Sequence, residues 1–253
     1  MRILIDSEAG TLEVWESTGA AEYPLFSPEA FRVVSRQFLT LGWNLGHWST
    51  FSWMGRQLLQ FPDDVLRLAE LLWRVRPDVI LETGIYDGGS TLLFAALCRL
   101  AGAGRVISIE KEIRAGVREA VQDWGSGLVT LVEGDSASAE AAAIARRAIG
   151  SGERVCVFLD ADHSAKHVAA ELRHYGPLVT SGCYLIVADS VIPEFAHTPS
   201  GERSWSWDNP GAAVDAFLAE YPEFLRERPL ARFGEGADFS ELSYFPDTWL
   251  RRS

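Results

Sequence analysis

Cysteine is scarce in this sequence: the chain of 253 residues contains three, Cys98, Cys156 and Cys183. The number is odd, each of the three lies inside an apolar run, and no C-x-x-C pair occurs. A disulfide framework needs paired cysteines, and a cysteine zinc site needs closely spaced ones. We therefore expect neither, and we interpret the three as reduced residues of the core.

Basic residues are also few relative to acidic ones. Lysine and arginine number 23 against 35 aspartates and glutamates, which gives a formal net charge of -12 and a pI of about 4.9. Proteins that bind nucleic acid phosphates or anionic membranes need a basic surface. The composition therefore argues against nucleic acid and membranes as partners and favours a small molecule, with or without a metal ion.

Long apolar runs are absent. No stretch approaches the ~18 residues that span a bilayer, and Asp6 and Glu8 come too early for a signal peptide. We therefore expect a cytoplasmic protein. Hydrophobic residues make up 47% of the chain, which is ample for a core, and we find no repeat or linker that divides it. One compact domain is expected overall.

Residues 79–90 carry a strand, turn and helix pattern. An apolar run ends in Glu82, Gly84 and a second pair of glycines follow, and Ser90 precedes an apolar-periodic stretch. This order predicts a buried strand, a tight turn and a helix that Ser90 caps.

The same turn predicts the chemistry of a ligand. The N-terminus of the helix offers free N–H groups and positive potential, which favour a carboxylate or another anion. Glu82, aimed into the same crevice, favours an ammonium or a hydroxyl group on that ligand. The methionine part of S-adenosylmethionine suits both demands, whereas Glu82 should repel the pyrophosphate of a dinucleotide, and the glycine spacing departs from G-x-G-x-x-G. The alternative is a plain βα turn that binds no cofactor.

Four more apolar runs follow the first, with helical stretches between them. Strands are expected at 79–82, 105–110, 128–133, 155–160 and 183–189, and helices at 62–74, 112–122, 137–149, 164–174 and 210–220. Continuous apolar strands separated by helices indicate an α/β fold with a doubly wound, mostly parallel sheet and helices on both faces. A small hairpin within 2–15 and a helix at 28–40 precede it, and the tail near 229–245 is expected to add the last strands.

Acidic side chains stand at the strand ends, where an open α/β sheet binds its ligands. Glu110 ends the second strand, where an acid commonly accepts hydrogen bonds from the ribose of an adenosine cofactor. Asp135 and Ser136 follow the third strand and are expected to meet an adenine edge. Taken singly, Asp135 or Ser136 is also typical of a helix N-cap.

Asp160 ends the fourth strand and Asp189 the fifth. If these strands are neighbours, the ends lie ~4.8 Å apart. Two carboxylates at that distance repel by roughly 3 kcal/mol at an effective dielectric near 20. A divalent ion with oxygen ligands, ordinarily Mg²⁺ with several waters, would bridge such a pair. The alternative is one protonated carboxyl group, or pairing with Lys166.

His163 lies three residues beyond Asp160, at the mouth of the sheet. A neutral imidazole there is suited to remove a proton from a substrate hydroxyl that a metal polarises, so His163 and Asp160 are the predicted catalytic residues. A lone histidine is more often structural. His163 and His167 also stand four apart, as zinc ligands do, but the glutamate of H-E-x-x-H is missing and we discount zinc.

Residues 43–53, WNLGHWSTFSW, concentrate aromatic side chains without clear periodicity. That density suits a lid or pocket wall that buries an organic substrate. The alternative is ordinary packing of an N-terminal segment on the core. We expect residues 1–54 to form the hairpin, a helix and this aromatic segment, and residues 55–253 to form the cofactor-binding domain.

With these motifs in hand, the chain resembles the cephalosporin hydroxylase family over most of its length. The landmarks are 53–55 (WMG), 60–64 (QFPDD), 76–84 (RPDVILETG), 88–90 (GGS), 133–136 (EGDS), 159–163 (LDADH), His167, Glu171, Tyr175 and 207–210 (WDNP). Members of this family look like class I S-adenosylmethionine-dependent methyltransferases. The resemblance therefore implies that fold, which is Rossmann-like, and S-adenosylmethionine as the cofactor.

Macrolide sugar O-methyltransferases look like relatives, and the resemblance carries their residue roles over. It implies that Asp160 and Asp189 hold Mg²⁺ and that His163 is the base. Two positions depart from the family pattern. Ala188 stands where relatives often carry a glutamate, and Glu110 stands where aspartate is usual.

The prediction is an S-adenosylmethionine-dependent O-methyltransferase, assisted by a divalent metal, that acts on a hydroxyl of a small molecule such as a sugar of a glycosylated natural product. The residues expected to bind the cofactor are Glu82, Gly84, Tyr86, Gly88, Ser90, Glu110, Asp135 and Ser136. A homo-oligomer is expected, because an isolated hairpin is marginal and needs a partner. The alternatives are an NAD-dependent dehydrogenase, a catalytically reduced cofactor-binding or assembly protein of the same fold, and a hydroxylase, whose two-histidine, one-carboxylate iron pattern is not apparent.

Overall fold

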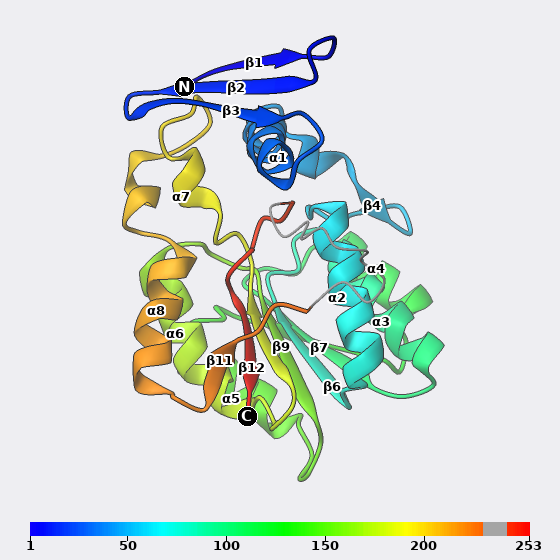
Figure 1. Ribbon diagram of the computed structural model, residues 1–253. Helices are drawn as coiled ribbons and strands as arrows, with labels where there is room; N and C mark the ends of the chain where they lie inside the picture. The colour runs from blue at the N-terminus through cyan, green and yellow to red at the C-terminus, as the bar shows by residue number, and fades with distance from the viewer. Residues whose placement is uncertain (230–241) are drawn as a thin grey trace.

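A seven-stranded sheet forms the centre of the molecule (Figure 1). The structure is a computed structural model and describes residues 1–229 and 242–253. The strand order is β11-β12-β10-β9-β6-β7-β8. The bounds are β6 Val79–Thr83, β7 Arg105–Glu110, β8 Val129–Glu133, β9 Val155–Leu159, β10 Tyr184–Val187, β11 Phe224–Arg226 and β12 Trp249–Arg252. Strands β6 to β10 are parallel, because a helix returns the chain to the same end of the sheet after each of them.

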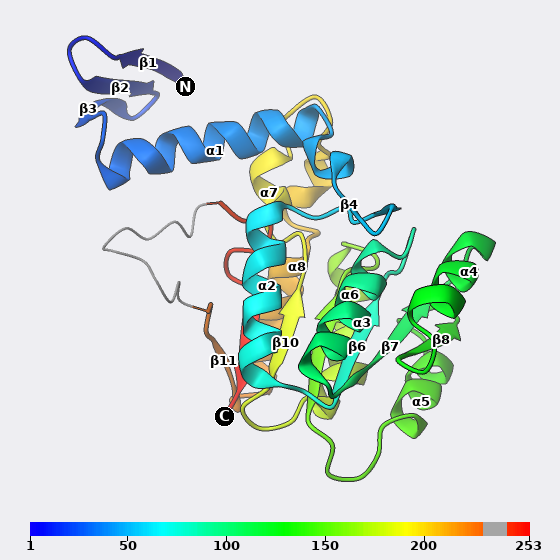
Figure 2. The same cartoon turned by 90° about the vertical axis from the view of Figure 1, so that its right-hand side faces the viewer.

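Helices cover both faces of this sheet (Figures 1 and 2). One face carries α2 Pro62–Val75, α3 Gly89–Ala101 and α4 Ala115–Trp124, and the other carries α5 Ala139–Arg147, α6 Ala165–Tyr175 and α8 Pro210–Glu220. Strands β6 and β9 are buried along their whole length, as continuous apolar runs should be. The expected doubly wound α/β fold is therefore confirmed. Among the described residues, no helix has the length and apolar character needed to cross a membrane.

The N-terminal segment forms its own small sheet beside a long helix (Figure 2). Strands β1 Arg2–Asp6, β2 Thr11–Glu16 and β3 Gly19–Pro24 pair antiparallel, and α1 Pro28–Asn44 follows. Leu12, Val14 and Ala30 form the small core between them. The hairpin was expected, but the third strand was not, because its residues lack an alternating apolar pattern. Helix α1 also runs four residues beyond the expected end.

The last strands lie outside the range expected for them. Residues 230–241 of the predicted 229–245 stretch are not among the described residues, and 242–245 form no strand. Strands β11 and β12 flank that range and pair antiparallel with each other, and β12 pairs antiparallel with β10. Burial of Trp249 and Leu250 fixes β12 on the sheet.

Candidate active site

A pocket of about 550 Å³ opens at the carboxyl ends of the parallel strands. The predicted residues that line it are Gly84, Tyr86, Ser90, Glu110, Asp135, Ser136, Asp160, His163 and Asp189. Residues from five different strand ends therefore meet in one cavity, as the parallel topology requires. Glu82 and Gly88 are the two predicted residues that do not line it.

Gly84 sits where the turn after β6 passes close to the end of the neighbouring strand β9. Its φ is +81°, and a Cβ added there would overlap the backbone carbonyl of Asp160. Only glycine permits both this left-handed conformation and this approach. Gly84 thus sets the distance between the turn after β6 and the end of β9.

The start of α3 differs from the prediction. The N-cap is Gly88, in the left-handed region at φ +90°, and no side chain caps the helix. Ser90 lies inside α3, so the expectation that it caps the helix was wrong. Because no side chain takes up the first N–H groups of α3, those donors are left for solvent or a ligand.

Glu82 lies below the turn rather than in the pocket. It is fully buried, and its Oε2 accepts hydrogen bonds from Thr91 Oγ1 at 2.6 Å and Ser108 Oγ at 2.8 Å. Oε1 has no partner among the described residues. Burial raises the pKa of Glu82 to about 7. A direct contact between Glu82 and a cofactor stays a prediction.

Glu110, which was expected to accept hydrogen bonds from a ribose, accepts them from the backbone of the turn after β6. Its Oε2 accepts from the backbone N–H of Ile85 at 2.8 Å and of Tyr86 at 2.9 Å, and Oε1 accepts from the N–H of Lys111 at 2.9 Å. Oε1 has a further lone pair, so it can still accept a hydrogen bond from a ribose hydroxyl. The ring of Tyr86 lies under the guanidinium of Arg114, 4.0 Å from it.

Asp135 and Ser136 do not cap the next helix. The N-cap of α5 is Ser138, so the N-cap alternative was wrong for both. The buried Ser136 lies with its Oγ 3.0 Å from His167 Nε2. His167 Nε2 is also 3.5 Å from Glu171 Oε1, and this contact raises the pKa of His167. His167 lines the pocket, and the predicted set lacked it.

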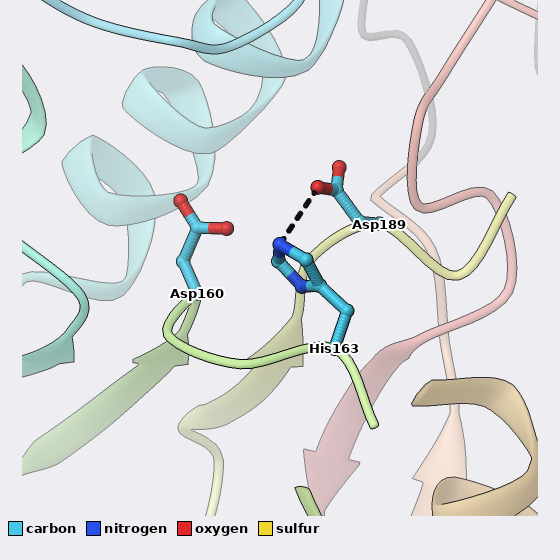
Figure 3. Close-up of side chains that lie close together, drawn as sticks. All are labelled: Asp160, His163 and Asp189. Atoms are coloured by element: carbon cyan, nitrogen blue, oxygen red, sulfur yellow. Dashed lines mark ion pairs between the residues drawn. The ribbon is translucent and has the colours of Figure 1, made fainter. Parts of the chain in front are cut away.

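Asp160, His163 and Asp189 come together at one point of the pocket (Figure 3). Their potential ligand atoms all lie within 4.8 Å of one another, and His163 Nε2 is 3.2 Å from Asp189 Oδ2. Burial, and then the neighbouring Asp189, raises the pKa of Asp160 well above its usual range. Burial likewise raises the pKa of Asp189. The pairing with Lys166 is not seen, because that side chain is exposed and does not line the pocket.

Two further contacts shape this part of the site. Gln60 Nε2 donates to Asp160 Oδ2 at 2.8 Å, so α2 and the segment before it help to orient the carboxylate. Asp189 has φ +58°, a left-handed conformation uncommon for aspartate. Sequence reasoning missed Gln60, although the residue stands in the QFPDD motif at 60–64.

The aromatic segment combines the two roles that were weighed for it. Trp43 and Trp48 line the pocket, whereas Trp53 does not. Trp43 also stacks on Phe195 at 5.0 Å and meets the ring of Tyr244 edge-on at 5.4 Å. The segment is therefore both a pocket wall and part of the aromatic packing that joins it to distant parts of the chain.

Comparison with known proteins identifies the family. The model of the Rhamnosyl O-methyltransferase/CmcI family matches residues 45–253. The chain belongs to this family. The expected resemblance is confirmed under that description, and the protein is an enzyme, an O-methyltransferase. The dehydrogenase and hydroxylase alternatives are not supported.

Curated relatives carry the same family description. The rhamnosyl O-methyltransferase of Mycobacterium leprae is 29% identical over 192 residues, which cover 71% of this chain and 76% of that protein. The protein of the same name from Mycobacterium tuberculosis (strain ATCC 25618 / H37Rv) is 28% identical over 189 residues, covering 71% of this chain and 72% of its own length.

Solved structures support the fold. A CmcI structure with Mg and SAM superposes with a TM-score of 0.54 at 21% identity, covering 81% of this chain and 77% of its own. The SAH-bound Podospora anserina methyltransferase PaMTH1 gives 0.51 at 20% identity, covering 76% and 82%. At these identities the likeness concerns the fold alone.

Proposed function

We propose that this methyltransferase moves a methyl group from S-adenosylmethionine to a hydroxyl of a sugar-like small molecule, with a divalent ion held by Asp160 and Asp189. The observation that carries the proposal is the meeting of Asp160, His163 and Asp189 in a pocket of about 550 Å³ beside the turn after β6. Relatives named rhamnosyl O-methyltransferase support the sugar acceptor.

The pocket suits a ligand that carries both charge signs. The uncapped N-terminus of α3 favours a carboxylate. Asp160 and Asp189 line the pocket and favour cations, because neither has a lysine or arginine ion pair among the described residues. The ammonium and sulfonium groups of S-adenosylmethionine meet that demand.

The acids also suit a divalent ion. Two carboxylates at neighbouring strand ends supply oxygen ligands, and Mg²⁺ commonly binds through one or two carboxylates and retained waters. Ala188 supplies no third carboxylate, so waters or the acceptor would complete the shell. When bound, such an ion polarises the acceptor hydroxyl as a Lewis acid.

His163 is placed to move the proton. Its Nε2 lies 3.2 Å from Asp189 Oδ2, and we assign the uptake of the hydroxyl proton to whichever ring nitrogen carries no proton. The acceptor oxygen then forms a bond to the methyl carbon while the carbon–sulfur bond breaks, and neutral S-adenosylhomocysteine leaves. Placing the acceptor oxygen in line with the carbon–sulfur bond supplies most of the remaining rate acceleration.

Binding and turnover test the proposal separately. Isothermal titration should give heats for S-adenosylmethionine and S-adenosylhomocysteine but none for NAD. Labelled methyl transfer to a panel of glycosides, rhamnosides first, should then identify an acceptor and should stop in chelator. Cofactor binding with no transfer to any hydroxylated acceptor would instead favour the catalytically reduced protein, with Ala188 as the trace of that loss. If Asp189→Ala kept full activity in chelator, the proposed mechanism would have no role for a metal ion.

We also propose a homo-oligomer that uses the exposed side of α1. Val34, Phe38, Leu41 and Leu45 are exposed and follow one another at intervals of four, three and four residues. That spacing places Val34, Phe38 and Leu41 on one stripe of α1, with Leu45 at its C-cap, and such a stripe is typical of helix pairing. A second copy of the chain is the occupant that we propose, because a two-fold contact would bring the same apolar stripe of both copies together.

A further inference from the structure

Tyr244 carries a buried hydroxyl that nothing in the described residues satisfies. The side chain is 1% exposed, and its OH has no hydrogen-bond partner among those residues. Buried polar groups are nearly always paired, because an unpaired one forfeits its hydration without compensation. An unpaired hydroxyl next to a cavity therefore points to a ligand that supplies the partner.

The surroundings hold Tyr244 rigidly. Its backbone N–H donates to Asp64 Oδ2 at 2.7 Å, and its carbonyl accepts from the N–H of Val191 at 3.0 Å. The ring packs between Trp43, at 5.4 Å and 87°, and Phe61, at 5.3 Å. A donor fixed in this way loses little freedom when it binds, which is the geometry expected of a recognition group.

The position of Tyr244 joins it to the chemistry of the site. It lines the same pocket as His163 and Asp189. Burial, and then Asp189, raises the pKa of Tyr244, so the phenol keeps its proton and remains a donor. The wall also contains Trp48, whose indole Nε1 is likewise buried without a partner among the described residues. One wall of the pocket thus offers unpaired donors on aromatic rings, whereas Asp160 and Asp189 offer carboxylate oxygens.

We propose that Tyr244 is an acceptor-binding residue whose phenol donates a hydrogen bond to a second oxygen of the acceptor, one that is not methylated. This rests on the proposed function. The acceptor class that fits is a ring with several oxygens. One hydroxyl would lie at Asp160, His163 and Asp189, and another would accept from Tyr244. Aromatic rings such as that of Trp43 suit the apolar face of a sugar. An acceptor with a single oxygen gains nothing from this donor.

The test compares Tyr244→Phe with a matched control, Tyr184→Phe. Tyr184 is also buried, but it starts β10, and its OH donates to Glu227 Oε1 at 2.7 Å. Initial rates are measured with saturating S-adenosylmethionine and methyl rhamnoside as the acceptor probe, together with S-adenosylhomocysteine titration and thermal unfolding.

For Tyr244→Phe we expect KM for the rhamnoside to rise about 10-fold, the value of one lost hydrogen bond. Its kcat and S-adenosylhomocysteine affinity should change less than about threefold, roughly the scatter of such measurements. Its Tm should be unchanged or higher, because no intramolecular bond is lost. Tyr184→Phe should show the opposite, a lower Tm and an unchanged KM.

An unchanged KM in Tyr244→Phe, with the wild type active, would overturn the assignment and leave the proposed function standing. A lower Tm in this variant together with weaker S-adenosylhomocysteine binding would also overturn it, since the role would then be structural. A wild type that binds the cofactor but methylates no rhamnoside would overturn the sugar acceptor and the role of Tyr244 with it.

Discussion

At the scale of single residues, Gly84 is the position where backbone geometry and site geometry coincide. Its φ is +81°, and a Cβ would strike the Asp160 carbonyl, so Gly84→Ala adds both backbone strain and a clash with the backbone at the end of β9. We expect a loss of about 3 kcal/mol in the free energy of unfolding, measured by urea denaturation. The control is Gly127→Ala, at φ +78° with open space around it, which adds strain alone. Equal losses in the two variants would contradict a special role for the close approach at Gly84.

His163 tests the chemistry rather than the fold. Its imidazole is partly exposed at the pocket and contacts Asp189, so His163→Ala should fold normally and lose the proton acceptor. We expect turnover to fall roughly 10²- to 10⁴-fold with little change in S-adenosylhomocysteine affinity. His197 lies outside the pocket, and His197→Ala is the control for a general effect of losing a histidine. Turnover close to that of the wild type in His163→Ala would leave Asp162 or water as the base.

The residues that the sequence predicted correctly into the pocket share one property: each follows a strand that the apolar runs identify. Parallel strands place their carboxyl ends at one edge, so the meeting of Glu110, Asp160 and Asp189 follows from the strand pattern alone. Gln60 and Tyr244 stand in irregular segments outside the parallel strands, and no local pattern indicates which strand end such a residue reaches. Glu82 shows that a strand-end position does not decide where the side chain points, because its carboxylate is buried in the core and does not line the cavity.

At the scale of elements, Asp64 ties the start of α2 to the segment that precedes β12. It is fully buried, and its carboxylate accepts from Ser243 Oγ at 2.5 Å and from the N–H of Tyr244 at 2.7 Å. Burial raises the pKa of Asp64 from 3.8 to about 7. Between these two values the folded protein keeps a proton that the unfolded chain releases. Stability from this group is therefore fully present below the unfolded pKa of 3.8 and falls as the pH rises toward 7.

Asp64→Asn should remove that pH dependence. Between about pH 5 and 7, the wild type should lose up to about 1.4 kcal/mol per pH unit more than the variant does, which can be measured as the difference between two series of denaturation curves. Glu82 titrates in the same direction and is present in both proteins, so the difference isolates Asp64. Parallel curves would mean that the hydrogen bonds from residues 243 and 244 keep Asp64 ionised in the folded state.

Some helices and strands could be predicted from local sequence patterns, and others could not. The five parallel strands are continuous apolar runs, and the helices between them show the helical period, so both were identified. Strand β3 reads GAAEYP and is mostly exposed, so nothing in its composition marks it as a strand. The wrong prediction of the α3 cap also has a physical reason. The turn requires a left-handed φ at Gly88, so the helix begins at Gly89 and Ser90 lies inside it.

At the scale of the whole molecule, the division at residues 54 and 55 stays a prediction, although long-range contacts join the two parts. Trp43 packs on Phe195 and Tyr244, and Arg36 pairs with Glu194 at 2.7 Å. The N-terminal part therefore closes the pocket from one side while presenting its own outer surface. The sequence predicts the helix of α1, but it does not show which of the apolar residues in it face the core and which stay exposed.

The last prediction concerns the exposed stripe of α1. We expect a charged residue placed on that stripe to dissociate the proposed oligomer. Leu41 on α1 is 62% exposed and Leu45 at its C-cap is 83% exposed, and an exposed apolar patch is typical of a surface that a partner covers. If a second copy covers them, Leu41→Glu should convert the oligomer to a monomer in light scattering after size exclusion, because burying an unpaired carboxylate at the contact opposes association. Leu66→Glu is the matched control, since Leu66 is 71% exposed on α2. A wild type that is monomeric at concentrations far above those of the assay would refute the oligomer, and the stripe would then need a different partner to explain its exposure.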